Sequence, residues 1–281
     1  MRKSLLFLFI VFIMIASSPA IAQPRGDTKI LLPLALEESI RGAFGSQWIT
    51  RVSVLNHGPE PVSLEGYFIT ECSIPCGFQP TPPGITFYPV FHFDDVGRRQ
   101  VEGAFLYTTR AHLRWIDVDV HIQDLSRQSL TWGTEIPAVP ETEAFTENLV
   151  LGDIPIEPRF RSLLRVYDFD PDRRLNSQPK KIAYRIFRIR PDLRYPLDPE
   201  DTRRVVAADP LIASGELTFV VAQLGLPNYP GYTRLDLSSI PALQNQERIR
   251  IELTPITQGL RYWAFVAVTN NETQHVTTVT P

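Results

Sequence analysis

Apolar and polar residues alternate along much of this chain, and an alternation with a period of two residues is typical of β-strands that bury one face. The segment 48–54 places its tryptophan and two valines on one face of such a strand, with Arg51 and Ser53 on the other. The Asn-His-Gly-Pro sequence at 56–59 is typical of a turn. Because a second alternating run follows at 62–68, we expect the two segments to form a β-hairpin.

The same alternation returns in later segments. Up to Trp115 the apolar residues of one run occupy odd positions, whereas from Ile116 they occupy even positions, and this change predicts a β-bulge. No segment shows the helical period of about 3.6 residues over more than about three turns. Further strands are expected at 116–122, 130–136, 149–151, 160–166, 181–189, 216–223, 248–253, 260–268 and 275–280.

The expected strands form two sets, one on each side of an acidic segment. Between residues 135 and 157 the chain carries Asp and Glu but no Lys or Arg, and prolines interrupt it. We therefore predict a linker at 137–147 between a first domain at 23–136 and a second domain at 148–281. Since one antiparallel sheet needs another to cover its apolar face, each domain is expected to be an all-β sandwich of two antiparallel sheets.

The first 22 residues have the features of a secretory signal peptide. Segment 1–22 combines a basic start, an apolar run at 5–15, and the small residues Ala20 and Ala22 before the expected cut. The mature chain would then begin at Gln23, in the periplasm or outside the cell. The apolar run is shorter than the roughly 20 residues of a membrane span, and no second run follows, so no transmembrane span is expected in the mature chain.

Composition limits the class of protein and its partners. Hydrophobic residues make up 43% of the chain, which is enough to build packed cores and argues against a disordered protein. The formal net charge is −3, and loss of the basic residues in the signal peptide would make it more negative. Nucleic acid is therefore not an expected partner. The 25 prolines, well above the average share of about 5%, fit short strands joined by loops.

Two cysteines, Cys72 and Cys76, lie close together in a Glu-Cys-Ser-Ile-Pro-Cys-Gly sequence. In an oxidising compartment this spacing predicts a local disulfide bond that fixes the shape of a short loop. A metal site is the alternative, but no neighbouring Cys or His completes a usual ligand pattern. A redox pair is a further alternative, and the spacing departs from Cys-x-x-Cys.

The segment that follows the cysteines is rich in aromatic residues and proline. Its aromatic side chains could bind a sugar ring or fill a pocket of a partner protein. The alternative is that they form a lid over the core of their own domain, because large exposed apolar patches are uncommon on soluble monomers. These candidate ligand-binding residues are Phe78, Phe87, Tyr88, Phe91 and Phe93.

Two groups of acidic residues are candidates for a cation site. Asp117, Asp119 and His121 alternate along one expected strand, so they share a face and could bind a cation; the alternative is a solvated strand face. The segment 168–173 resembles the start of a calcium loop, but Arg173 stands where such a loop needs glycine. A turn between strands is the simpler interpretation, with calcium as the one cofactor considered.

Two segments resemble strands of immunoglobulin-like modules in exported bacterial proteins. The sequence Trp-Ile-Thr-Arg-Val-Ser-Val-Leu-Asn at 48–56 is similar to strand B of such a module, and the segment 262–281 is similar to its last two strands. The Cys…Trp…Cys core of antibody domains is absent. The resemblance implies two tandem immunoglobulin-like β-sandwich domains in a secreted bacterial protein, and it implies no active site.

The common catalytic signatures are missing from the sequence, including Gly-x-Ser-x-Gly and His-Glu-x-x-His. We therefore expect a non-catalytic exported module that binds an envelope protein or a glycan. Two alternatives stay open. One is a carbohydrate-binding protein that uses the aromatic segment 78–93, and the other is an envelope hydrolase whose carboxylates lie far apart in the sequence.

Overall fold

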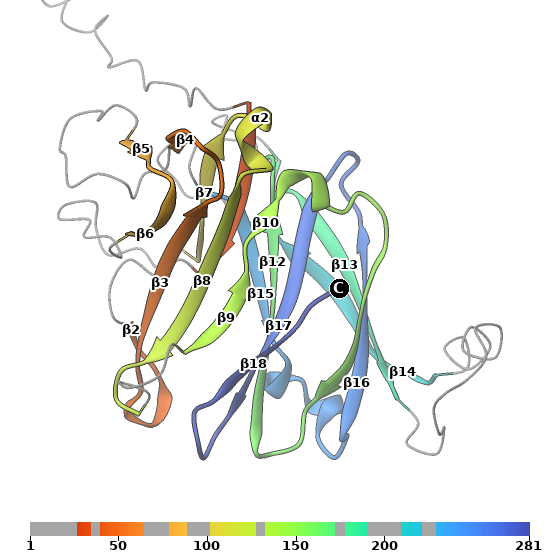
Figure 1. Cartoon of the computed structure of the whole chain (residues 1–281). Coiled ribbons are helices and arrows are strands. Elements are labelled where there is room, and N and C mark those ends of the chain that lie inside the picture. Colours follow the sequence, from red (N-terminus) through yellow and green to blue (C-terminus); the bar gives the residue numbers. More distant parts are fainter. Residues whose placement is uncertain are drawn as a thin grey trace, which may run out of the picture.

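The structure of the protein, a computed structural model, is built almost entirely from antiparallel strands (Figure 1), so the expected all-β class is confirmed. It describes residues 27–34, 40–64, 79–88, 102–127, 133–171, 178–189, 209–220 and 229–281. The predicted signal peptide at 1–22 lies outside these ranges. Within them, no helix has both the length and the apolar content that a membrane crossing needs.

In the described part of the first half there are ten strands, one α-helix and two short 3-10 helices. They are β1 Thr28–Pro33, β2 Ile40–Arg41, η1 Ala43–Gly45, β3 Gln47–Asn56, β4 Val62–Leu64, β5 Gln79–Thr81, β6 Gly84–Tyr88, β7 Gly103–Thr108, α2 Arg110–Leu113, β8 Ile116–Asp124, β9 Thr134–Pro137, β10 Val139–Pro140 and η2 Glu141–Glu143. One sheet has the order β2-β3-β8-β9, with β6 also paired to β3. A second has the order β10-β1-β7, and β4 pairs with β5.

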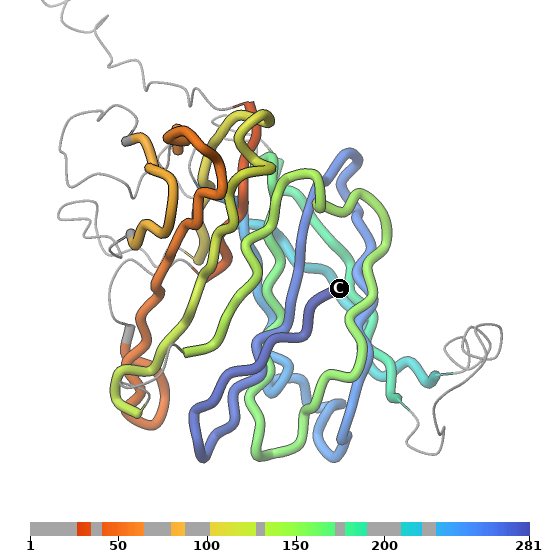
Figure 2. Tube along the Cα trace, viewed as in Figure 1, coloured from red at the N-terminus to blue at the C-terminus, as the bar shows by residue number. Residues whose placement is uncertain are grey.

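The second half forms two four-stranded antiparallel sheets. Their orders are β11-β16-β13-β14 and β15-β12-β17-β18. The elements are β11 Leu149–Pro155, β12 Phe160–Asp168, β13 Lys181–Arg188, β14 Leu211–Thr218, β15 Gly231–Asp236, η3 Leu237–Ser239, η4 Pro241–Leu243, β16 Arg248–Pro255, β17 Tyr262–Asn270 and β18 Val276–Val279. In Figure 2 the orange-to-yellow strands of the first half lie beside the green-to-blue strands of the second.

The sheet β15-β12-β17-β18 is buried on both faces, because a different core packs against each. Side chains at successive positions of a strand point to opposite faces. In β17, Tyr262, Ala264 and Val266 belong to the core between the two sheets of the second half. Trp263 and Phe265 point the other way, into the core of the first half.

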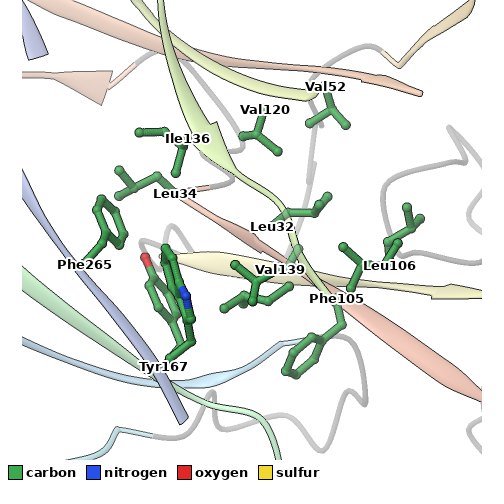
Figure 3. Packing of buried hydrophobic residues seen from close by; sticks show 14 of the residues in the cluster. Leu32, Leu34, Val52, Phe105, Leu106, Val120, Ile136, Val139, Tyr167 and Phe265 are labelled. Atoms are coloured by element: carbon green, nitrogen blue, oxygen red, sulfur yellow. The ribbon is translucent and has the colours of Figure 1, made fainter. Parts of the chain in front are cut away.

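The first core therefore contains residues from both halves of the chain. Leu32 of β1 and Phe105 of β7 belong to the same buried cluster as Tyr167 and Phe265 (Figure 3). The rings of Phe105 and Phe169 lie 5.6 Å apart, which places an aromatic contact across the junction of the two halves. Burial of these side chains is the main physical reason why the two halves stay together.

The predicted linker at 137–147 packs against both halves. Val139 is 1% exposed and pairs with β1. Phe145 and Tyr262 exchange two backbone hydrogen bonds of 2.8 and 2.9 Å. The Glu141 carboxylate contacts side chains from both halves. This segment thus has regular structure of its own, while the predicted domain boundaries stay a prediction.

Two predicted details of the strands are wrong. The parity change at Trp115 comes from α2, in which the amide of Leu113 donates to the carbonyl of Thr109 at 3.0 Å, rather than from a bulge. The strand expected at 216–223 is β14, which begins earlier. Glycine inside a segment weakens a strand prediction, yet Gly215 lies inside β14, against the ring of Tyr184.

Candidate functional site

The outer face of β3 and its two neighbours brings together residues from separate parts of the sequence. β3 pairs with β6 along one edge and with β8 along the other. Ser53 is the register partner of both Phe87 on β6 and Asp119 on β8. In the next row, Leu55 is the partner of Ile85. Since register partners share a face, these side chains lie side by side on one surface.

A partly open depression of about 250 Å³ lies on this surface. Three strands, β3, β6 and β8, supply its lining, so the depression exists only when their register is correct. We call this surface the β3–β6–β8 face. Its residues are Arg51, Val52, Ser53, Leu55, Ile85, Phe87, Asp119 and His121.

The apolar part of the face lies on β6. Ile85 is 63% exposed and Phe87 is 64% exposed, which makes them two of the most exposed large hydrophobic residues in the described ranges. They are two positions apart in a strand, so they form one continuous apolar stripe. Exposure of such a stripe costs free energy in water, and adjacent exposed apolar groups commonly mark a binding surface.

The polar part of the face lies on β3 and β8, and within the described residues its side chains form few hydrogen bonds. Among the residues that the structure describes, the side chain of Arg51 forms no hydrogen bond or ion pair, although its backbone pairs with that of His121. Asp119 accepts one long bond of 3.4 Å, from the hydroxyl of Ser53. The Nδ1 atom of His121 is buried without a hydrogen-bond partner in the same ranges. A ligand on this face could reach the side chains of Arg51 and Asp119, whereas the Nδ1 atom of His121 is closed to solvent.

The alternating residues Asp117, Asp119 and His121 do share one face of β8, as their spacing predicted. Asp117, however, contacts His57, with 2.5 Å between its Oδ2 and the Nε2 of the imidazole. Across the described ranges, no three His, Cys, Asp or Glu side chains lie close enough together to hold a metal ion. The cation site therefore stays a prediction.

The aromatic segment and the cysteines are described only in part. Phe87 lies on the β3–β6–β8 face with its ring exposed, which differs from the alternative of a core lid for this residue. The remaining candidates fall outside the described residues, except for the backbone of Tyr88 in β6. They are Phe78, Phe91, Phe93, the side chain of Tyr88, and the predicted disulfide pair Cys72 and Cys76.

The acidic turn after β12 is neutralised by basic side chains. Lys29 Nζ lies 2.8 Å from Asp170 Oδ1, and Lys180 Nζ lies 3.0 Å from Asp168 Oδ1. Arg261 Nε lies 3.3 Å from the second oxygen of Asp170. Burial raises the pKa of Asp168 above its ordinary value, although Lys180 opposes this effect. These contacts hold the described part of the segment, residues 168–171, in place, and the choice between a turn and a calcium loop stays a prediction.

A buried ionic contact joins the two halves, and no pattern in the sequence pointed to it. Glu102, whose side chain is 7% exposed, accepts hydrogen bonds of 2.5 Å from both Arg165 on β12 and Arg234 on β15. The three residues are far apart in the sequence and belong to no motif. Only the packing of β7 against the sheet of β12 brings them together.

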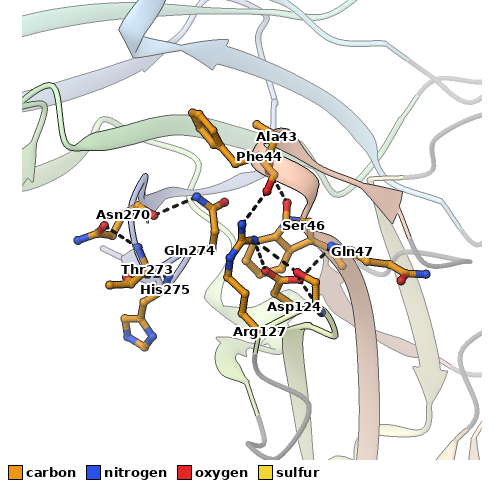
Figure 4. Close-up of polar contacts among 12 residues, drawn as sticks. Ala43, Phe44, Ser46, Gln47, Asp124, Arg127, Asn270, Thr273, Gln274 and His275 are labelled. Carbon is orange, nitrogen blue, oxygen red and sulfur yellow. Dashed lines mark hydrogen bonds and ion pairs between the residues drawn. The ribbon is translucent and has the colours of Figure 1, made fainter.

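A further polar cluster lies where loops from both halves meet (Figure 4). The buried carboxylate of Asp124 accepts hydrogen bonds from the amide of Gln47 at 2.9 Å, the hydroxyl of Ser126 at 2.6 Å and the guanidinium of Arg127 at 3.1 Å. Arg127 also donates to the carbonyl of Phe44. Burial alone would raise the pKa of Asp124, but these hydrogen bonds outweigh it, so the pKa lies below its ordinary value.

Comparisons with known proteins add no further constraint. No family model matches this chain, and no curated protein or solved structure matches it. The β3–β6–β8 face is therefore interpreted from its own geometry.

Proposed function

We propose that this protein is a non-catalytic exported binding module, and that the β3–β6–β8 face is its binding surface. The observation that carries the proposal is the exposed pair Ile85 and Phe87 beside Asp119, which accepts one long hydrogen bond, and Arg51, whose side chain has no partner among the described residues. Apolar area supplies affinity, and a few unsatisfied polar groups supply orientation and specificity. Without a ligand, these exposed apolar side chains and unsatisfied polar groups would add no stability to the folded protein.

Export and the immunoglobulin-like class belong to the same proposal. The basic, apolar and small-residue regions of segment 1–22 support secretion to the periplasm or the cell exterior. The two four-stranded antiparallel sheets of the second half, which enclose one core, support a sandwich module. An envelope protein or a glycan is the expected class of partner.

The alternatives differ in how much the geometry supports them. Carbohydrate binding is supported by the exposed ring of Phe87, although the aromatic surface is a strand face rather than a loop. The hydrolase alternative needs carboxylates beside a depression. Asp119 is the one carboxylate among the residues that line the depression, whereas this chemistry uses a pair. Within the described ranges, the two carboxylates with shifted pKa values, Asp124 and Asp168, are held by hydrogen bonds and line no part of the β3–β6–β8 face.

A site-specific photo-crosslinking experiment tests the proposed surface. A photoreactive amino acid replaces Ile85 in one variant and Ile256, which is 46% exposed directly after β16, in the control. Both proteins are exported and illuminated in the native envelope. We expect a discrete crosslinked product at Ile85 that excess unlabelled wild-type protein suppresses. Equal crosslinking at both positions, or none at Ile85, would overturn the proposal.

A further inference from the structure

We infer that the ligand of the β3–β6–β8 face is an uncharged oligosaccharide, bound with one sugar ring against Phe87 and its hydroxyl groups on Arg51 and Asp119. This inference rests on the proposed function and specifies the chemistry of that surface. It assigns a ligand-contacting role to Arg51, which the sequence marked only as part of the polar side of a strand.

The hydrogen-bonding capacity of the face indicates hydroxyl groups. A guanidinium such as that of Arg51 can only donate hydrogen bonds, whereas a carboxylate such as that of Asp119 can only accept them. A ligand that offers only acceptors, such as a phosphate, would satisfy Arg51 and repel Asp119. A ligand that offers only donors, such as an ammonium group, would do the reverse. A hydroxyl both donates and accepts, so a polyol can satisfy both side chains at once.

The charge of the face excludes a strongly ionic ligand. The positive charge of Arg51 and the negative charge of Asp119 lie within one depression and offset each other. Glu135 on β9 is the register partner of His121 and adds a negative charge next to the depression. An acidic polysaccharide would meet this carboxylate as well as Asp119, and like charges disfavour binding.

The apolar stripe of Ile85 and Phe87 fits the apolar faces of a sugar ring. A pyranose ring carries C–H groups on its faces, and these pack well against an aromatic ring. Phe87 and Asp119 lie on strands two spacings apart, a separation of about 10 Å across the sheet. A short oligosaccharide laid across β6, β3 and β8 would contact the apolar stripe and the polar groups together. An added peptide strand would instead use the edge of β6 and leave Asp119 unsatisfied.

Calorimetric titration of the purified mature protein tests this inference. The probes are neutral pentasaccharides of glucose, xylose, mannose and N-acetylglucosamine, with an oligogalacturonate as the charged comparison. We expect at least one neutral probe to bind, and Phe87→Ala or Arg51→Met to weaken it by about tenfold or more. Asp119→Asn keeps an acceptor and is expected to weaken binding less than Asp119→Ala. Ile256→Ala serves as the matched control and should leave the affinity unchanged.

The outcomes separate the inference from the function on which it rests. Absence of binding by every neutral probe at millimolar concentration, tighter binding of the oligogalacturonate, or full affinity in Phe87→Ala would each overturn the inference. A suppressible crosslink to a protein at Ile85 would then leave the proposed binding surface standing with a different ligand. Because Phe87 is exposed, its alanine variant should keep the melting temperature of the wild type, so lost binding reports the contact rather than unfolding.

Discussion

The guanidinium of Arg165 donates a hydrogen bond of 2.5 Å to the carboxylate of Glu102, and this contact joins the first half of the chain to the second. Both side chains are mostly buried, with exposed fractions of 15% and 7%. The partner on the other oxygen, Arg234, is 53% exposed. Glu102 therefore lies between one buried cation and one solvated cation.

Replacement of Glu102 by Gln is expected to destabilise the protein strongly. The variant leaves the buried guanidinium of Arg165 without a counter-charge, and loss of one partner of a buried ion pair costs about 3–5 kcal/mol. Arg234→Gln is the matched control, because it removes an exposed partner and should cost about 1 kcal/mol or less. Urea denaturation measures both free energies of unfolding. Equal costs for the two variants would contradict the structural role given to the buried pair.

The Asp124 cluster predicts a loss of stability in acid. The pKa of Asp124 in the folded protein lies below its ordinary value of 3.8, so its contribution is fully present above that pH. The contribution disappears as the pH falls through the lower, folded-state pKa. We expect Asp124→Asn to lower the melting temperature near neutral pH. In acid, the melting temperature of the variant should fall less steeply with pH than that of the wild type. Melting curves from about pH 2 to pH 7 test this, and an unchanged acid slope in the variant would count against it.

Asp168 affects the pH dependence of stability in the opposite direction from Asp124. Burial raises its pKa, so the folded protein holds this proton more tightly than the unfolded chain does. Its effect on stability is therefore most favourable below pH 3.8 and becomes less so as the pH rises through the folded-state pKa. In the same melting series, Asp168→Asn should remove this decline. A steeper decline in the variant would show that the sign is wrong.

Much of the fold could be predicted from local pattern. The alternation at 48–54 gave the position of β3, and the run at 248–253 gave most of β16. The continuous apolar run in β17 predicted a strand but not its environment, because alternation is lost when both faces are buried. α2 was missed because a single helical turn is too short to show its period.

The candidate site could be predicted only in pieces. Phe87 and the Asp119–His121 pair were each identified from the sequence, but as separate candidate sites. Their convergence depends on the register of β6 and β8 against β3, which joins positions more than thirty residues apart. Strand register between distant segments follows from packing and turn geometry, so a single sequence does not reveal it.

The shared core predicts that the two halves unfold together. Phe265 lies on β17 of the second half, yet it packs in the first core, where its ring stacks on Tyr167 at 6.3 Å. Phe265→Ala should cost about 3–5 kcal/mol, whereas the exposed Phe87→Ala should change stability by about 0.5 kcal/mol or less. Thermal unfolding followed by tryptophan fluorescence and by circular dichroism should give coincident transitions in both variants. Two separated transitions would show that the halves are energetically independent.

The central claim is that the β3–β6–β8 face is where this protein meets its ligand. Its most direct test is the binding isotherm of the labelled mature protein on isolated envelopes, measured for wild type, for Arg51→Ser/Phe87→Ser, and for Val150→Ser/Arg248→Ser on another sheet. The account predicts saturable binding that the first double variant loses and the second keeps. Equal binding by all three proteins would contradict it.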